Sequence, residues 1–149
     1  MRKDMIRTSL AASGFLLAAL SAQAQQAGPT LTVTVAGAEP NSGQIIISLF
    51  DSPDTYMKEA VATRTLPVGE AGASTFVFEG LAVGEYAATV IYDEDSDGEL
   101  DTGFLGIPKE KIGFSNNARG RMGPAPFEKA KFAFGEAGAW IGVNLEQVR

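Results

Sequence analysis

The sequence predicts an all-β protein, a single antiparallel β-sandwich of about seven strands with one long acidic loop. From Thr30 onward, apolar residues recur at every second position, which is the period of a β-strand. Clusters of Gly, Pro, Asn and Ser separate these apolar runs at short intervals. No long run with helical periodicity interrupts the pattern, and such a chain is typical of a sandwich.

Seven segments carry the alternation, and each is expected to form one strand. In the first segment Leu31, Val33 and Val35 share one face, opposite three threonines. A hairpin is expected between the first two segments, because residues 40–43 read Pro-Asn-Ser-Gly. Residues 52–60 are expected to form at most one helical turn. The seven segments are residues 30–37, 43–51, 60–68, 73–81, 84–95, 129–134 and 139–147.

Aromatic side chains at strand spacing are expected to build the core. Phe76 and Phe78 share a face of one segment, and Tyr86 and Tyr92 share a face of another. Trp140 is likewise expected in the core rather than on a sugar-stacking surface.

The beginning of the chain carries the pattern of an export signal. Arg2, Lys3 and Arg7 precede an apolar run over residues 9–20, and Ala22-Gln23-Ala24 has the small-x-small form that signal peptidase reads. Residues 1–24 are therefore expected to be a cleaved signal peptide. The rest, residues 25–149, would be a single secreted domain in the periplasm or outside the cell, with no membrane insertion after cleavage. An uncleaved anchor is the alternative, but the run is short for a span of about 20 residues.

Composition excludes several classes of function. After cleavage, 9 basic and 17 acidic residues remain, a net charge of −8 that disfavours nucleic acid and anionic lipid as partners. The chain has no His and no Cys, which removes the commonest general base, transition-metal ligand and thiol nucleophile. A non-enzymatic protein with an unknown envelope or extracellular partner is expected.

The stretch from Asp93 to Asp101, DEDSDGELD, holds six carboxylates in nine residues. Asp93, Asp95, Asp97 and Asp101 stand at positions 1, 3, 5 and 9 of an EF-hand-type loop, with Gly98 at position 6. Glu99 would supply its carbonyl at position 7. Alternate side chains of a curling loop converge on one centre, so the spacing predicts a Ca²⁺ site. The candidate ligands are Asp93, Asp95, Asp97, Glu99 and Asp101.

Two other interpretations of this stretch stay open. Position 12, where an EF-hand has a bidentate Glu, is Phe104, and Asp97-Gly98 is a strong signal for a type I′ hairpin turn with solvated acids. A carboxylate pair performing acid–base catalysis is the third interpretation. Farther on, Ser115 lacks a nucleophile motif, and Asn116 and Asn117 are expected to bond to nearby backbone, although they also form a candidate binding loop.

Several linked motifs in this half of the chain occur in a fixed order. They are Gly84–Ala87, Asp93–Asp101, Leu105–Pro108, Gly113–Asn117 and Pro126-Phe127. In this respect the chain resembles the DUF2141 family of exported bacterial proteins over residues 43–145. The resemblance implies an immunoglobulin- or transthyretin-like sandwich and no established activity. Acids stand at 95 and 97 where that family often has Asn, and Tyr92 stands where it often has His.

Two hypotheses about function follow. The first is a non-enzymatic binding or structural module of the bacterial envelope, with Ca²⁺ ordering the acidic loop. The second is an enzyme or enzyme accessory that acts on an envelope polymer through the Asp93–Asp101 carboxylates. A purely structural domain with a solvated hairpin is a third, simpler possibility.

Overall fold

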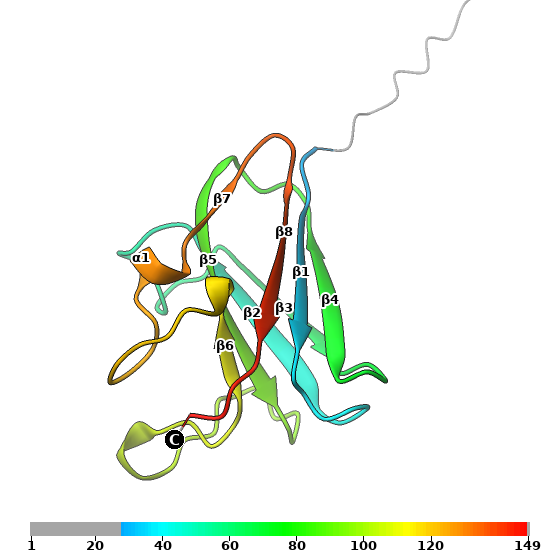
Figure 1. Cartoon of the computed structure of the whole chain (residues 1–149), viewed down its shortest axis with the longest axis vertical. Coiled ribbons are helices and arrows are strands. Elements are labelled where there is room, and N and C mark those ends of the chain that lie inside the picture. The colour runs from blue at the N-terminus through cyan, green and yellow to red at the C-terminus, as the bar shows by residue number, and fades with distance from the viewer. Residues whose placement is uncertain (1–27, 149) are drawn as a thin grey trace, which may run out of the picture.

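The computed structural model describes residues 28–148, so the expected signal peptide and its cleavage site lie outside the described residues. Eight strands, two single-turn 3₁₀ segments and one short helix make up this part of the chain (Figure 1). No helix within residues 28–148 is long and apolar enough to cross a membrane. The strands are β1 (Leu31–Ala36), β2 (Gln44–Phe50), β3 (Ala62–Pro67), β4 (Ala73–Phe78), β5 (Gly84–Asp93), β6 (Ile112–Phe114), β7 (Phe132–Phe134) and β8 (Ala139–Asn144).

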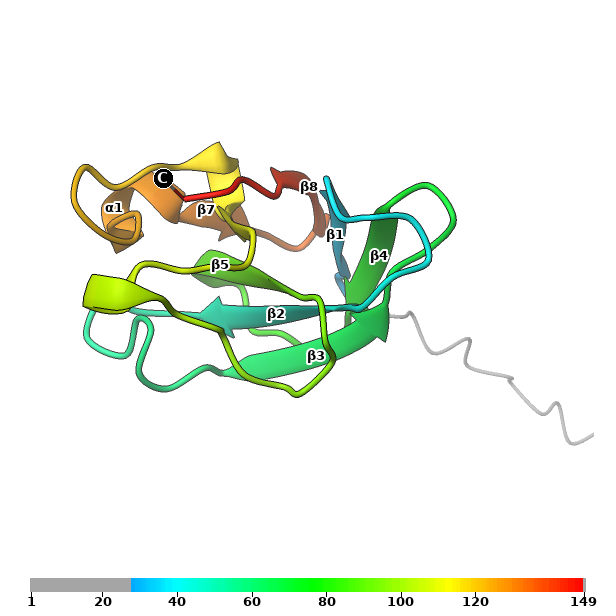
Figure 2. The ribbon, with the colours of Figure 1, turned by 90° about the horizontal axis from the view of Figure 1, so that it is seen from below.

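The strands form two sheets packed in a sandwich-like arrangement, which confirms the all-β prediction (Figures 1 and 2). One sheet has three strands in the order β4-β1-β8. The other has the order β3-β2-β5-β6, with β7 pairing with β5 beyond the end of β6. The sandwich is not wholly antiparallel, because β1 and β8 pair in parallel, with Val33 opposite Ile141. The expectation of purely antiparallel sheets is therefore wrong at this pair.

The predicted hairpin between the first two strands is also wrong. β1 pairs with β4 and β8, whereas β2 pairs with β3 and β5, so residues 37–43 carry the chain from one sheet to the other. This crossing is tied to the turn between β3 and β4: Ala38 N donates to Gly72 O (3.1 Å) and Asn41 N to Gly69 O (3.2 Å). The Pro-Asn-Ser-Gly sequence forms a turn, but the turn leads to the other sheet.

The core lies between the sheets and follows the predicted alternation. Leu31, Val33 and Val35 from β1 are fully buried, and Ile45, Ile47 and Leu49 from β2 face them from the other sheet. The aromatic rings Phe76, Phe78, Tyr86, Tyr92 and Phe134 join the same cluster. Trp140 does not: its side chain is 70% exposed, because Ile141 and Val143 occupy the inner face of β8. The placement of Trp140 in the core was therefore wrong.

A second, smaller core covers the outer side of the larger sheet. The segment that follows the acidic loop contains β6, the 3₁₀ turn η2 (Ser115–Asn117) and helix α1 (Phe127–Ala130). Phe114, Phe127 and Ala130 from this segment pack on Phe50 and Ala87 of β2 and β5. Tyr56, from the turns of residues 52–59, makes edge-on ring contacts with Phe50 and Phe127. The segment after the acidic stretch is thus anchored on the sheet.

Candidate metal centre

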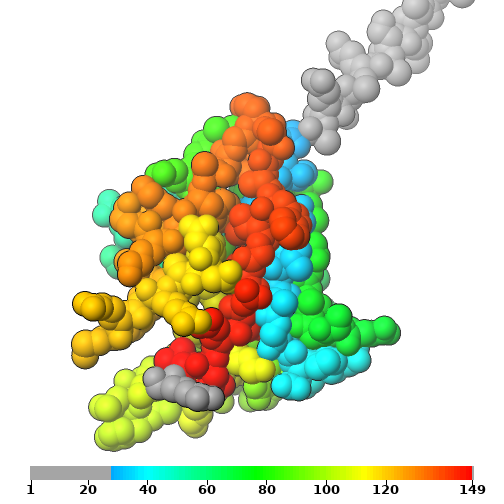
Figure 3. Space-filling view, viewed as in Figure 1, coloured from blue at the N-terminus to red at the C-terminus, as the bar shows by residue number. Residues whose placement is uncertain are grey.

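The acidic stretch begins at the last residue of β5, Asp93, and continues into the loop of residues 94–111 that leads to β6. The loop extends beyond the end of the sandwich and forms a separate lobe in the space-filling view (Figures 1 and 3, yellow-green). The type I′ hairpin interpretation is wrong. After the loop, β5 pairs with β6 and not with the residues that directly follow Asp97-Gly98. A type I′ turn also requires the left-handed conformation at both central residues. Gly98 (φ 87°) takes it, as does Ser96 (φ 61°) before the pair, but Asp97 does not.

Asp93 is the buried anchor of the loop, with no exposed surface. Its Oδ2 accepts hydrogen bonds from Gln44 Nε2 (2.6 Å) and from the backbone N–H of Gly98 (2.9 Å). Its Oδ1 accepts a longer bond from Asp97 N (3.2 Å). A buried carboxylate is costly unless its oxygens are hydrogen-bonded, and these donors meet that need while curling the loop around the side chain.

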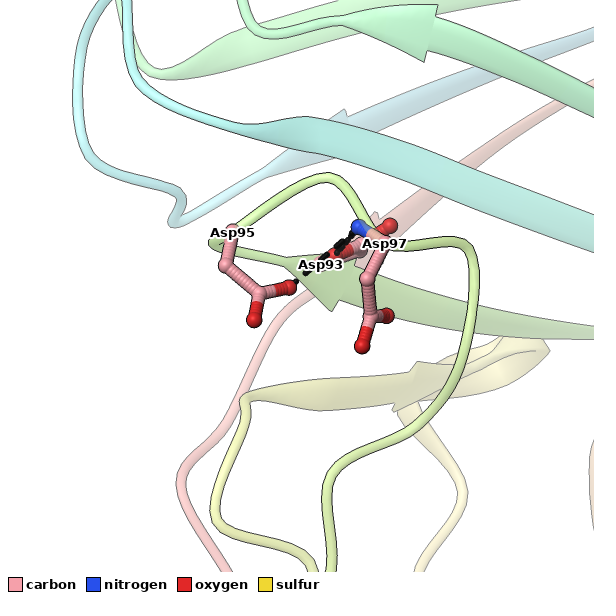
Figure 4. Close-up of side chains that lie close together, drawn as sticks. All are labelled: Asp93, Asp95 and Asp97. Atoms are coloured by element: carbon pink, nitrogen blue, oxygen red, sulfur yellow. Dashed lines mark hydrogen bonds between the residues drawn. The ribbon is translucent and has the colours of Figure 1, made fainter.

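Residues 94–101 form the curled part of the loop, called the curl below. Asp95 and Asp97 extend from the curl toward the same side, with Asp93 behind and between them (Figure 4). One carboxylate oxygen from each of Asp93, Asp95 and Asp97 lies within 4.8 Å of the others. Asp97 N also donates to Asp95 Oδ1 (3.3 Å), and Glu99 N donates to Asp97 Oδ1 (2.8 Å). Asp95 and Asp97 are exposed. This group of three carboxylates could hold a metal ion.

The pKa values of two of these carboxyls move in opposite directions. Burial alone would raise the pKa of Asp93, but hydrogen bonds from Gln44, Gly98, Ser96 and Asp97 outweigh it and hold the value below that of an ordinary Asp.

For Asp95, the hydrogen bond from Asp97 N lowers the pKa. Desolvation and the nearby carboxyl groups of Asp97, Asp93 and Asp101 raise the pKa. Together they outweigh the hydrogen bond, so the net pKa of Asp95 lies above the ordinary value. The curl therefore collects negative charge that a cation would relieve.

Glu110 closes the loop at its base. Its side chain is 5% exposed; Oε1 accepts from the backbone N–H of Glu94 (2.9 Å) and Oε2 from that of Asp101 (3.0 Å). One carboxylate thus joins the two ends of the acidic curl. Beyond it, Lys109 N donates to Asp101 O (2.9 Å), so the chain returns alongside itself. The curl is therefore held in place by bonds from its own backbone.

The other predicted ligands lie differently. The carboxylates of Glu99 and Asp101 are exposed and do not belong to the close group, although the ligand predicted for Glu99 is its backbone carbonyl and not its carboxylate. Leu100 is half-buried, and Phe104, which stands at position 12, is 88% exposed in the single-turn segment η1 (Phe104–Gly106). Of the five candidate ligands, the structure brings together the side chains of three.

Asn116 and Asn117, the candidate binding loop, make hydrogen bonds that tie distant segments together. Asn116 Nδ2 donates to Lys131 O (2.8 Å), and Asn117 Oδ1 accepts from Asn144 N (2.9 Å). Both residues take left-handed backbone conformations (φ 59° and 48°), which Asn tolerates better than most residues. Ser115 is buried; its Oγ accepts from Ala88 N (2.9 Å) and donates to Ala130 O (2.5 Å). The three polar side chains hold the second core against β5 and β8, rather than bonding nearby backbone.

Sequence reasoning missed the residues that support the curl. Gln44 lies 49 positions before Asp93, and Glu110 lies 16 positions after Glu94, so no local spacing points to either. Gly43 was assigned to a turn and to the start of the second strand segment, with no link to the acidic loop. A Cβ at Gly43 (φ 68°) would stand 2.5 Å from Asp93 O, so only glycine allows this close approach. Pairing of Gln44 with Asp93 across β2 and β5 is what assembles the support.

Comparison with known proteins assigns the chain to one family. The family model described as "Uncharacterized protein conserved in bacteria (DUF2141)" matches residues 33–141, from β1 to β8 and including the acidic loop. The chain belongs to this family. Neither the curated proteins nor the solved structures that were compared contain a match.

Proposed function

We propose that this DUF2141 protein is an exported, non-enzymatic binding or structural module of the bacterial envelope, whose acidic loop is ordered by Ca²⁺. The observation that carries the proposal is the close group of Asp93, Asp95 and Asp97, one oxygen of each lying within 4.8 Å of the others. The two-sheet arrangement supports an immunoglobulin- or transthyretin-like scaffold as part of the same proposal.

The chemistry of the group suits calcium. All its donors are oxygens, and Ca²⁺ accepts six to eight oxygen ligands from carboxylates, carbonyls and water in irregular geometry, whereas Mg²⁺ requires a near-ideal octahedron. Asp95 and Asp97 are exposed, so water can complete the coordination. Asp93 Oδ1 carries only one long hydrogen bond, which leaves it free to ligate, while Oδ2 stays engaged with Gln44 and Gly98.

The same geometry argues against acid–base catalysis by the loop. A general acid needs a pKa near the working pH. The pKa of Asp93 is instead held below the ordinary value, and its Oδ2 accepts hydrogen bonds from two N–H donors, of Gln44 and Gly98. Asp95 has a raised pKa, but it stands exposed at a loop surface rather than in a cleft that excludes water. Asp93 and Asp95 therefore give no support to acid–base catalysis by the loop.

Export and partner class rest on the sequence. The Ala22-Gln23-Ala24 pattern after an apolar run supports cleavage, and the strongly acidic mature chain makes nucleic acid an unsuitable partner. N-terminal sequencing of the exported protein is expected to begin at Gln25 or within a residue or two. Recovery of the full-length chain in the membrane fraction would contradict export.

The test of the calcium proposal is calorimetric titration of the mature domain with CaCl₂, next to melting curves in calcium and in chelator. Extracellular calcium modules bind at about 0.1–1 mM, so a Kd in that range is expected. At a hundredfold excess over Kd, Ca²⁺ should stabilise the fold by about 2.7 kcal/mol, which is a melting shift of several degrees. NaCl at matched ionic strength should give no such shift. Identical melting curves in calcium and chelator would refute the proposal.

A further inference from the structure

Besides the short strand β7, the two sheets have four edge strands, and three of these four are protected. At one side of the sandwich the edges of β6 and β8 meet: Ile112 and Glu146 exchange backbone hydrogen bonds, and Gly113 lies against Val143 and Asn144. At the other side, the edge strand β3 carries Arg64 and Pro67. A charged residue and a proline are common devices that keep a sheet edge from pairing with another chain.

The fourth edge, β4, has none of these devices. Its sequence, ASTFVF, contains no charge and no proline, and its register with β1 runs without a bulge from Ala73 to Phe78. Thr75 and Val77 on its outer face are exposed, Val77 to 47%. An uncharged edge strand of this kind is a template for a further strand.

Side chains of β3 are uncovered next to this edge. Arg64 and Leu66 pair with Ile47 and Ile45 across β2 and β3, so they point to the core side of their sheet. Both are nevertheless exposed, Leu66 to 37%. The smaller sheet ends at β4, and no strand among residues 28–148 lies beyond it to cover them. Figure 2 shows β3 as the outermost strand of one sheet and β4 as the outermost strand of the other.

The space between the two edges is a groove of about 440 Å³, lined by Thr63, Arg64, Thr65, Leu66, Thr75, Phe76 and Val77. Arg64 is the one charged residue in this lining, and its guanidinium lies 5.3 Å from the centre of the Phe78 ring. The one charge in the lining is therefore positive, opposite in sign to the net charge of the chain. Its walls are otherwise apolar or hydroxylated.

The geometry points to the β4 edge and this groove as a docking site for an extended segment of a partner protein. The segment adds to β4 as a further strand, so its backbone bonds to the free edge, and alternate side chains enter the groove. There an acidic side chain meets Arg64 and apolar side chains cover Leu66. A second copy of this chain fits less well, because β4 carries no acidic residue of its own and the first one, Glu79, lies beyond the end of the strand. The site is independent of the calcium proposal.

Two short synthetic peptides test the inference. Both alternate threonine with inward-facing residues; in one these are Val-Asp-Val, and in the other Val-Lys-Val. Binding is followed by NMR of the mature domain, with exchange of the β4 amides that point away from β1 as the readout of strand addition. The Asp peptide is expected to bind roughly two- to fivefold more tightly than the Lys peptide, the range of a solvent-accessible ion pair. It should slow exchange on β4.

Charge exchange provides the control. Arg64→Glu is expected to reverse the preference in favour of the Lys peptide, and Arg64→Gln to abolish it, whereas Arg121→Glu, the same charge change outside the groove lining, should leave it unchanged. Melting curves check that each variant is folded. The inference is overturned if neither peptide binds, if both bind equally, or if protection appears away from β4. Sedimentation that reveals a dimer abolished by Val77→Lys would assign the edge to a second copy and would also overturn it.

Discussion

Gln44 and Asp93 face each other across β2 and β5, and the Gln44 side chain donates a 2.6 Å hydrogen bond to Asp93 Oδ2. This contact joins the start of one central strand to the end of its neighbour, at the point where the acidic loop begins. The amide supplies a donor to a buried carboxylate without adding a charge. The loop thus depends on a residue far from it in the sequence.

Replacement of that donor tests the dependence. Gln44→Glu places a second carboxyl group against buried Asp93, so it removes a hydrogen bond and adds like-charge repulsion. A loss of about 1–3 kcal/mol in the free energy of unfolding is expected at neutral pH, measured by urea denaturation. Gln147→Glu makes the same change at an exposed side chain near the C-terminus, where the hydrogen bond from Gln147 Nε2 to Lys109 O (2.8 Å) is lost but no buried carboxylate is left without its donor, so it should cost less. Equal effects of the two substitutions would contradict the role of Gln44.

Because the pKa of Asp93 is lowered, the stability of the fold is expected to depend on pH in the acidic range. A carboxyl whose folded pKa lies below its unfolded value, about 3.9, contributes stability above that value and loses it as the pH falls through the folded pKa. The protein should therefore lose stability below about pH 4. Asp93→Asn should be less stable at neutral pH and should lose less on acidification. Urea unfolding across this range measures both, and parallel pH profiles for the two proteins would exclude Asp93 as the cause.

Glu110 should control the mobility of the loop. In Glu110→Gln one of the two carboxylate acceptors becomes an NH₂ donor, so either Glu94 N or Asp101 N loses its partner. Faster hydrogen exchange at these amides is expected, with a loss of about 1–3 kcal/mol in stability. Glu99→Gln removes an equal charge at an exposed side chain and serves as the control. Unchanged exchange at both amides would show that the bridge does not hold the loop.

The loss of stability on truncating an aromatic side chain should follow its burial in the structure rather than its spacing in the sequence. Tyr86→Ala and Phe134→Ala remove rings that are 5% and 1% exposed and stand edge-on at 6.0 Å, so each should cost about 3–5 kcal/mol. Phe132, two positions earlier on the same strand, is only half-buried, and its truncation should cost less. Thermal or urea unfolding measures the difference. An equal loss from Phe132→Ala would contradict the packing described here.

The fold class was predictable because alternation reports which face of a strand is buried; β1 and β4 follow it residue by residue, and β2 follows it as far as Leu49. Strand partners were not predictable in the same way. The Pro-Asn-Ser-Gly turn specifies a change of direction, and only the packing of Ala38 and Asn41 against the turn between β3 and β4 decides that the chain changes sheet. Trp140 shows a second limit of prediction from the sequence. Alternation alone did not identify the buried face of β8, which carries the smaller side chains Ile141 and Val143.

The three carboxylates of the candidate site were predictable from the sequence, whereas the residues that support them were not. Asp93, Asp95 and Asp97 alternate within a few residues, so local curling alone brings them together. Gln44 and Glu110 reach the site through strand pairing and through the return of the chain from residue 101 to residue 109, which no local pattern encodes. Asp101 has the spacing of a ligand, yet its N–H donates to Glu110 and its carboxylate stays outside the group. The carboxylate of Glu99 also stays outside the group, while the ligand predicted for Glu99 is its backbone carbonyl.

That difference between the acids gives the calcium proposal its sharpest test. Asp97→Asn removes charge from the close group, whereas Glu99→Gln removes the same charge from an exposed side chain outside it. If the three carboxylates are the ligands, Asp95→Asn and Asp97→Asn should abolish the calcium-induced rise in melting temperature, and Glu99→Gln should retain most of it. Without calcium, Asp95→Asn should be as stable as the parent or slightly more so. The raised pKa of Asp95 means that its ionised form opposes folding at neutral pH. Melting curves of the four proteins in CaCl₂ and in chelator measure both effects. A uniform reduction by all three substitutions would indicate diffuse screening of an acidic loop, and no specific site.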